Sequence, residues 1–233
     1  MLFRSIQNIT GELVELMKRG IYHYRFEDDN FTLRPMFEDL TDSIKGLGIR
    51  YKCHTRSDSL IRHPERAYLM KESGCEECGI GVESADNRVL RINNKKETAE
   101  QHKEAVSILK RAGIRVKTYF MAGLPGETDD TLELNKRFMA EAKPDKWTLS
   151  TFTPYPGCEI FNYPERFGIT IADKNWDKWW NFAESGFNHT LNGQTQEQMW
   201  NRYKQFYNWL KEESWRQQKM FNTIHPSSPA RYV

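Results

Sequence analysis

CGIGVESAD (78–86) joins an apolar run to glycines and then to acidic and hydroxyl side chains, the pattern of a buried strand that ends in a polar loop. The pattern recurs at YRFEDDNFT (24–32), KCHTRSDSL (52–60), FMAGLPGET (120–128) and FTPYPGCEI (152–160). A stretch with helical spacing of apolar residues precedes each following strand. This alternation predicts a parallel α/β sheet whose carboxyl-terminal strand ends carry a site.

The predicted helices begin and end at residues that favour helix termini. Ser5 can cap the first helix, which closes at Gly20, and Thr32 can cap the second, which closes at Gly48. The remaining helices of this part are expected from Pro64 to Met70, from Thr98 to Gly113, and from Thr128 onward. We expect a first strand beginning at residue 21 and further strands at 49–54, 78–82, 114–122 and 147–152.

The composition suits a globular chain with one large domain and an appendage. Of the 233 residues, 38% are hydrophobic and 13% aromatic, which is enough for a sizeable core. The 34 basic and 32 acidic residues nearly cancel, so the charge favours a small-molecule or peptide substrate over nucleic acid. No apolar run reaches the roughly 18 residues of a membrane span. The N-terminus lacks a signal peptide's apolar stretch, so we expect no membrane association and a cytoplasmic protein with reduced thiols.

The composition changes after about residue 160. Residues 161–233 are rich in aromatic residues, poor in strand patterning, and include a predicted helix from about Thr195 to Gln218. We therefore predict a core of residues 1–160 and a mostly helical cap or extension of residues 161–233. WDKWWNF (176–182) is interpreted as the core of this cap, with an aromatic substrate wall as the alternative, and the Pro/Ser-rich tail as frayed.

Charged side chains at the first two strand ends could bind a ligand, or they could have only a structural role, which is the plain interpretation. Asp28 and Asp29 suit an ammonium group because charge-assisted hydrogen bonds are strong, but acidic residues are also common in turns. Arg56 could hold a carboxylate with its planar guanidinium, or it could be a surface arginine paired with Asp58.

The later strand ends offer groups suited to a nucleoside. Glu83 and Ser84 present an acceptor and a donor for ribose hydroxyls, or form only a tight turn. Gly123, Leu124 and Pro125 form a rigid loop whose exposed backbone groups could pair with a base edge. The following Glu127 is more often a loop-fixing residue than a chemical one, and TPYPG (153–157) is given a shaping role.

The cysteines and histidines give no metal site. CEEC (75–78) is a single CxxC pair, and a structural zinc normally needs four ligands. Cys75 is most simply a packed small hydrophobe. His54, His63 and His102 are scattered, and no catalytic residue can be assigned.

Five motifs in order resemble those of the radical S-adenosylmethionine (SAM) superfamily, and more narrowly the group that often carries an N-terminal cobalamin-binding domain. They are FEDDNFT, the strand ending in Arg56, GCEECGIGVESAD with KKET (95–98), KRAGIRVKTYFMAGLPGET and TPYPGCEIF. The resemblance covers about residues 4–161. It implies a partial (β/α)6 TIM-like barrel that binds SAM at its carboxyl-terminal strand ends, beside a 4Fe-4S cluster.

The resemblance also assigns roles to residues. Asp28 and Asp29 match the position that contacts the methionyl end of SAM or the substrate, and Glu83 lies near SAM. The strand end at Gly123 to Pro125 lies beside adenine, and Cys75 matches a Gly-Cys step before its strand.

The sequence departs from the family at its start. The family's three cluster cysteines lie in a CxxxCxxC loop after the first strand, and both strand and loop are missing here. We therefore expect a barrel without its first strand, in a fragment or one piece of a split enzyme, with a partner or missing domain supplying the cluster.

Two functions follow. The first is the SAM-binding part of an enzyme that forms a 5′-deoxyadenosyl radical, with cobalamin-dependent methyl transfer if an upstream domain exists. The alternative is a non-catalytic SAM-pocket module or partner subunit without its own cluster. An ordinary barrel hydrolase or isomerase ranks last, because no base and nucleophile can be identified.

Overall fold

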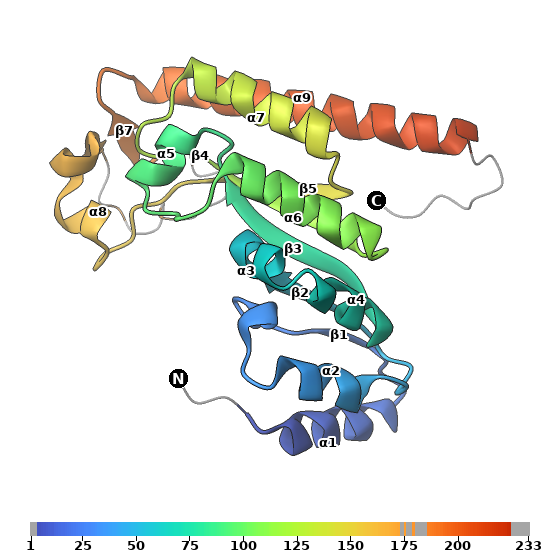
Figure 1. The fold of residues 1–233 in the computed structure, drawn as a ribbon. Coiled ribbons are helices and arrows are strands. Elements are labelled where there is room, and N and C mark those ends of the chain that lie inside the picture. Colours follow the sequence, from blue (N-terminus) through green and yellow to red (C-terminus); the bar gives the residue numbers. More distant parts are fainter. Residues whose placement is uncertain (1–3, 173–174, 176–178, 180–185, 225–233) are drawn as a thin grey trace. The chain divides into compact units, whose positions relative to one another are not determined.

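A computed structural model describes residues 4–172, 175, 179 and 186–224, in which one or two helices follow each strand of the main sheet (Figure 1). The strands of the main sheet are β1 (His23–Arg25), β2 (Arg50–Thr55), β3 (Cys75–Glu83), β4 (Arg115–Ala122) and β5 (Lys146–Thr151). The helices around them are α1 (Ile6–Met17), α2 (Phe37–Ile44), α3 (Ser57–Arg62), α4 (Glu65–Glu72), α5 (Asn87–Ile92), α6 (Ala99–Arg111) and α7 (Asp129–Ala142). The later elements are α8 (Glu159–Asn162), β6 (Ile169–Ile171), β7 (His189–Leu191) and α9 (Gln196–Ile224).

The main sheet has the strand order β1-β2-β3-β4-β5, so sequence neighbours are also spatial neighbours. The pairings β1–β2, β2–β3 and β3–β4 are parallel. Parallel strands in sequential order, joined by helices, have the topology of a (β/α) barrel. The predicted α/β class is confirmed, and β1 forms one edge of the sheet.

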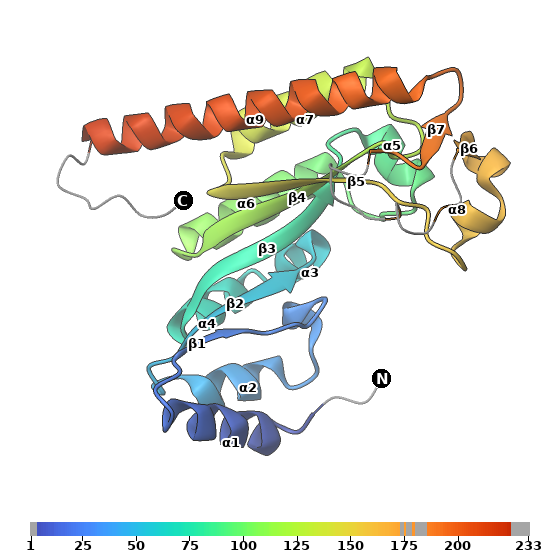
Figure 2. The ribbon, with the colours of Figure 1, turned by 180° about the vertical axis from the view of Figure 1, so that it is seen from behind.

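The chain divides into two compact units. Unit 1 contains Met1–Glu83, Lys96–Phe120 and Ala142–Thr148. In unit 1, helices α1 to α4 cover one face of strands β1 to β3 (Figures 1 and 2). An aromatic cluster fills the space between them, in which Phe31 contacts Phe37 and Tyr51, all three fully buried.

Unit 2 contains Ser84–Lys95, Met121–Glu141 and Leu149–Val233. Helix α9 runs alongside α7 in both views (Figures 1 and 2). Buried Leu132 and Phe138 of α7, with Met199 and Phe206 of α9, contribute to its core. Strands β6 and β7 pair antiparallel beside these helices. The predicted boundary near residue 160 stays a prediction.

Several predicted helix starts are confirmed, and one is wrong. Ser5 caps α1 by accepting a hydrogen bond from the Asn8 N–H at 3.2 Å. Thr98 caps α6 in a capping box with Gln101. Thr32 does not cap α2, which begins five residues later, because the Thr32 side chain forms buried hydrogen bonds with Thr55 and Ser59 instead.

The sequence does not predict several of the short elements. Helices α3 and α5 have only six residues each, too few to show a periodic apolar face. Strands β6 and β7 have three residues each and lie in the region expected to lack strands. The predicted C-terminal helix is confirmed as the longer α9. Most of the segment 176–182 and the tail from residue 225 lie outside the described residues.

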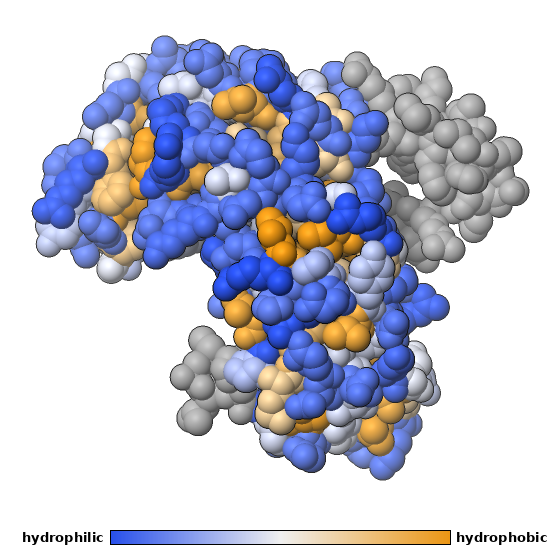
Figure 3. Space-filling model, in the orientation of Figure 1, coloured by the Kyte–Doolittle hydropathy of each residue, from blue (hydrophilic) through white to orange (hydrophobic). Residues whose placement is uncertain are grey.

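No helix in the described ranges is long and apolar enough to cross a membrane. Figure 3 shows a face on which apolar residues are interspersed among many hydrophilic ones. The exposed large apolar residues include Ile21, Met36 and Tyr68.

Candidate functional site

Two aspartates follow the end of β1, and they differ in burial and in hydrogen bonding. Asp28 is partly buried and accepts a hydrogen bond from Arg34 at 3.3 Å, and Arg34 also donates to the Arg4 carbonyl at 2.8 Å. Asp29 is exposed beside a groove of about 650 Å³. Asp29 is therefore the more accessible of the two carboxylates for an ammonium group.

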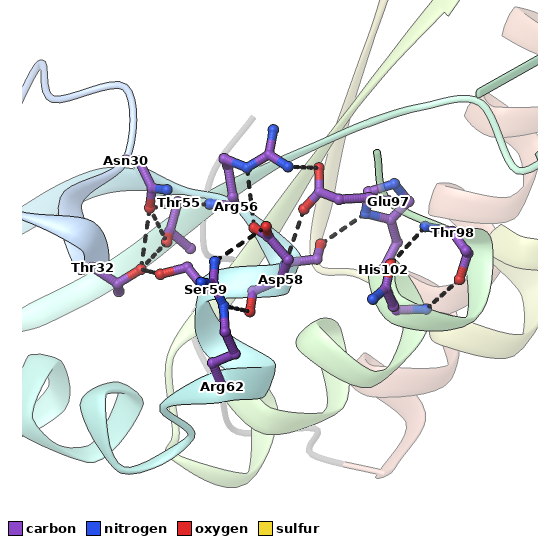
Figure 4. Close-up of polar contacts among 12 residues, drawn as sticks. Asn30, Thr32, Thr55, Arg56, Asp58, Ser59, Arg62, Glu97, Thr98 and His102 are labelled. Carbon is purple, nitrogen blue, oxygen red and sulfur yellow. Dashed lines mark hydrogen bonds and ion pairs between the residues drawn. The ribbon is translucent and has the colours of Figure 1, made fainter. Parts of the chain in front are cut away.

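Asn30 organises the loop between β1 and α2 (Figure 4). Its Oδ1 accepts hydrogen bonds from the Thr55 hydroxyl at 3.0 Å, the Thr32 hydroxyl at 3.2 Å and the Arg56 N–H at 3.4 Å. Its buried Nδ2 has no hydrogen-bond partner within the described part of the chain. A buried amide donor without a partner costs free energy unless a ligand or water accepts from it. Asn30 thus ties the ends of β1 and β2 together and keeps one donor available.

Arg56, at the end of β2, lies between two acids (Figure 4). Its Nε donates to Asp58 at 3.0 Å, and its Nη2 lies 3.4 Å from Glu97. Burial opposes the charge, but the Asp58 hydrogen bond and the attraction of Glu97 raise the pKa of Arg56. The pairing with Asp58 that the sequence allowed is present, and the Nη1 end of the guanidinium points away from both acids.

Glu97 is a site residue that the sequence reasoning missed. Its side chain is fully buried, and its Oε1 accepts a hydrogen bond from the Asp58 N–H at 3.0 Å. It precedes the Thr98 cap of α6, so the helix start holds it in place. The signal was present in KKET (95–98), where the glutamate stands next to the cap.

Glu83 ends β3 with an unusual backbone. Its φ is +62°, in the left-handed region that non-glycine residues rarely adopt, and the register with β4 shifts at this point. Such backbone strain clusters at ligand sites. Ser84, which is 1% exposed, accepts a hydrogen bond from the Asp86 N–H at 3.1 Å. Ser84 therefore forms a turn, as the plain interpretation allowed.

Glu127 fixes the loop after β4, as predicted. Its Oε2 accepts hydrogen bonds from the Gly123 N–H at 2.7 Å and the Leu124 N–H at 3.3 Å. These two N–H groups are not available to a base edge, contrary to the expectation, because the carboxylate already occupies them. The Pro125 carbonyl accepts from Asn93 at 3.1 Å, so this loop is largely satisfied from within.

Arg202 of α9 completes this arrangement in unit 2. It lies 3.5 Å from Glu127 and donates to Asp129 at 2.9 Å and to Gln194 at 2.9 Å. Burial raises the pKa of Glu127, and the opposing influence of Arg202 and the two backbone N–H groups favours its charged form. Sequence reasoning missed Arg202, because it lies far along the chain from the loop that it holds.

His189 of β7 binds the same loop. Its Nε2 lies 2.8 Å from the Gly123 carbonyl, an acceptor, so this nitrogen carries the proton. The ring is fully buried, and burial lowers its pKa. A neutral histidine thus holds one side of Gly123 and Glu127 holds the other.

The family model described as the radical SAM superfamily matches residues 2–139. The chain belongs to the radical SAM superfamily. That membership accounts for the order of motifs along β1 to β4, and for the polar residues at their carboxyl ends.

Curated relatives of this radical SAM chain are longer proteins. It is 31% identical to an uncharacterised methyltransferase, PH0819, of Pyrococcus horikoshii, over 75% of this chain and 38% of that protein. It is 30% identical to the bacteriochlorophyllide d C-12(1)-methyltransferase of Chlorobaculum tepidum, over 76% of this chain and 39% of the relative. An anaerobic magnesium-protoporphyrin IX monomethyl ester cyclase of Rubrivivax gelatinosus is 28% identical over 68% of this chain and 29% of its own length. The chain spans less than two fifths of each.

Solved structures share the fold. The radical SAM methyltransferase TsrM of Kitasatospora setae, with tryptophan and a SAM analogue bound, aligns with a TM-score of 0.67 at 14% identity. That alignment covers 88% of this chain and 46% of TsrM. The cobalamin-dependent enzyme OxsB, with aqua-cobalamin and SAM bound, gives a TM-score of 0.54 at 18% identity, over 70% of this chain and 26% of OxsB.

The cysteines of this radical SAM chain do not fit a 4Fe-4S cluster. Cys53 Sγ lies 3.9 Å from Cys75 Sγ and 4.0 Å from Cys78 Sγ, and all three thiols are buried in the sheet. Burial raises the pKa of Cys53 well above its usual value, which disfavours the thiolate that a cluster needs. Among the described residues, no group of three or more His, Cys, Asp and Glu is arranged to hold a metal ion. These thiols pack as small hydrophobes.

The unit 1 residues do fit SAM in their chemistry. Asp29 offers an accessible carboxylate, and Arg56 has guanidinium donors beyond those that contact Asp58 and Glu97 among the described residues. The Asn30 amide has a buried donor. They lie at the ends of β1 and β2, next to the strained Glu83 at the end of β3.

Proposed function

We propose that unit 1 binds SAM for a radical SAM enzyme whose cluster is held by cysteines outside this sequence. One observation carries the proposal. An acid, an arginine and an acid end three neighbouring parallel strands, at Asp29 after β1, Arg56 after β2 and Glu83 on β3. In parallel α/β sheets, ligands bind at the carboxyl ends of the strands.

Each residue has a role suited to its chemistry. Asp29 accepts from the ammonium group of SAM, Arg56 binds its carboxylate, and Glu83 accepts from a ribose hydroxyl. Asp58 and Glu97 orient the Arg56 guanidinium: its Nε lies 3.0 Å from Asp58 Oδ1, and its Nη2 lies 3.4 Å from Glu97 Oε2. SAM bound beside a reduced cluster would supply radical chemistry, and the protein orients it and excludes water.

The free edge of β1 supports a separate segment as the carrier of the cluster. β1 is paired on one side, by β2, and has no strand on its other side among the described residues. A groove of about 650 Å³ is lined by Leu13 and Leu16 of α1 and by Tyr24 of β1. An unpaired strand edge is a template for another strand. The proposed occupant is a strand that leads into a CxxxCxxC loop.

Methyl transfer is the reaction that the relatives favour, because two of the three named above are methyltransferases. Cobalamin would then come from another domain or subunit, as the OxsB and TsrM structures contain it. Cyclisation is the second possibility, on the likeness to the magnesium-protoporphyrin enzyme.

A non-catalytic SAM-binding partner subunit is the alternative function. The misfit of the three buried thiols to a cluster favours it, since the chain alone then lacks the electron source. Both functions require SAM binding and differ in whether a cluster assembles.

SAM binding is tested by isothermal titration calorimetry on the whole chain. Glu83→Ala and Asp29→Asn should each weaken SAM binding by about tenfold to a hundredfold, since a hydrogen bond to a charged group contributes about 1.5–3 kcal/mol. Glu72→Ala is the matched control, because Glu72 is an exposed acid that pairs with Lys45 at 2.6 Å. Undiminished binding by Glu83→Ala would overturn its ribose role.

Cluster assembly is tested by measuring iron and acid-labile sulfide after anaerobic reconstitution. The chain alone should bind no cluster, and the chain with a peptide or subunit carrying CxxxCxxC should bind about four irons. A SAM-perturbed paramagnetic signal in the mixture would favour the enzyme. SAM binding without any cluster in the mixture would favour the non-catalytic subunit.

A further inference from the structure

The face of the sheet opposite α1 to α4 in unit 1 is polar. On β2, buried Tyr51 and Cys53 alternate with Lys52 and His54. Side chains on a strand alternate between faces, so Lys52 and His54 share the other face. The polar face is defined here as Lys52, His54, Glu77, Lys117 and Tyr119, from strands β2, β3 and β4.

Near the amino-terminal ends of the strands, the charges of this face are paired. Glu77 lies 2.9 Å from Lys146 and 3.9 Å from Lys52. Burial works against its charge, but these two lysines lower the pKa of Glu77, so it stays ionised. The single carboxylate of Glu77 therefore pairs with two ammonium groups, those of Lys146 and Lys52. These three side chains together carry a net positive charge.

Lys117 lies further along β4 and has no such partner. In the part of the chain that the structure describes, it forms no ion pair, and its Nζ lies 4.8 Å from the centre of the Tyr119 ring. The Tyr119 hydroxyl is 2.9 Å from His54 Nε2. An ammonium group and two further polar groups thus meet on one face.

Gly79 of β3 makes room for this group. In the sheet register it pairs with His54 on one side and Lys117 on the other. A Cβ at this position would lie 2.5 Å from His54 Cδ2 and 2.8 Å from Tyr119 Cε2. The rings lean over a strand position that has no side chain.

The surroundings of Lys117 disfavour its charged form. Burial lowers its pKa, and repulsion from Lys146, Arg25 and Lys52 acts in the same direction, against the attraction of Glu77. Burial also lowers the pKa of His54, with Arg25 and Lys117 contributing, against the opposing influence of Glu27 and Asp29. A bound anion would relieve this repulsion.

We propose that Lys117, with Tyr119 and His54 beside it, binds an anionic group of the substrate, a carboxylate or a phosphate. The anion site stands on the geometry above, and its assignment to a substrate rests on the proposed function. The substrate class is then an acid or phosphate ester whose charged end lies on the polar face.

The test is a titration of the whole chain with inorganic phosphate and, separately, with succinate at constant ionic strength. The His54 ring signal, assigned by comparison with His54→Gln, is followed by nuclear magnetic resonance. A saturable shift is expected, with the tighter of the two probes identifying the anion. Lys117→Gln should weaken binding about tenfold, and Lys117→Arg should restore most of it. Lys18→Gln, at the exposed residue that follows α1, removes the same charge elsewhere and should not change anion binding.

The inference is overturned if neither probe gives a saturable shift, or if Lys117→Gln binds as tightly as the unmodified chain. Should Lys117→Gln fail to fold, Tyr119→Phe replaces it, with about threefold weaker binding expected from the lost hydrogen bond. SAM affinity is measured on the same samples. If the chain binds an anion but not SAM, the proposed function is wrong and the anion site is supported. If the chain binds SAM but neither anion, the anion site is wrong and the proposed function is supported.

Discussion

At the residue scale, the candidate site depends on side chains that hold other groups in place. Asn30 accepts from two hydroxyls and a backbone N–H with a single oxygen. Glu97 supports both the backbone and the side chain around Arg56. Neither residue was assigned a role from the sequence, because an amide or a carboxylate next to a turn has the same local pattern whether it binds a ligand or the protein itself.

Gly79→Ala should destabilise the fold by about 1–3 kcal/mol, because the new methyl group must displace two rings from a packed face. Urea denaturation measures this change. Gly11→Ala is the control, since Gly11 lies within helix α1 and a Cβ added there would have no neighbour within 4 Å beyond the backbone of its own helix and the adjacent residues. The control should stabilise the chain by about 0.5–1 kcal/mol. Equal effects of the two substitutions would contradict the close packing at Gly79.

His189 predicts a pH dependence of stability. Its pKa is lower in the folded chain than in the unfolded chain, where a histidine titrates near about 6.5. The unfolded state therefore binds the proton more readily, and the free energy of unfolding falls as the pH drops below about 6.5. Between about pH 8 and pH 5, the free energy of unfolding should depend more steeply on pH for the unmodified chain than for His189→Gln, as denaturation curves would measure. Equal pH dependence of the two chains would show that His189 is not held neutral.

At the element scale, α9 acts on the loop after β4 through Arg202. Arg202→Ala leaves the buried Glu127 carboxylate without its cation and should cost about 3 kcal/mol of stability, measured by urea denaturation. Adding Glu127→Gln to that variant should recover part of the loss, because the uncompensated charge is then gone. Arg166→Ala breaks an exposed pair with Glu159 and should cost less than about 1 kcal/mol. If Arg202→Ala lowers the free energy of unfolding as little as this control does, then α9 does not stabilise the loop after β4 through Arg202.

The sequence predicted the long, periodic elements well. The parallel order, the Ser5 and Thr98 caps, the Pro64 helix start and the loop-fixing Glu127 all depend on residues within a few positions of one another. Thr32 failed as a cap because Thr55 and Ser59, far along the chain, compete for its hydroxyl. Local patterns cannot show such tertiary partners, and for the same reason Arg202 and His189 were missed.

At the scale of the whole molecule, the thiols divide into two classes. Cys53, Cys75 and Cys78 are buried, whereas Cys158 is exposed. A thiol reagent should therefore label one cysteine quickly in the native chain and all four in urea, which spectrophotometric titration of thiols would count. Rapid labelling of more than one would place at least one of the three packed thiols within reach of solvent. The Cys158→Ser variant should then show no fast phase.

The crowded position at Gly79 also constrains how this chain can change over time. A side chain gained at residue 79 would press on both His54 and Tyr119, so it costs less free energy where one of these two residues has already become smaller. Among descendants of a common ancestor, residues 54, 79 and 119 should therefore vary together. A collection of related sequences would reveal the linked triplet as correlated substitutions.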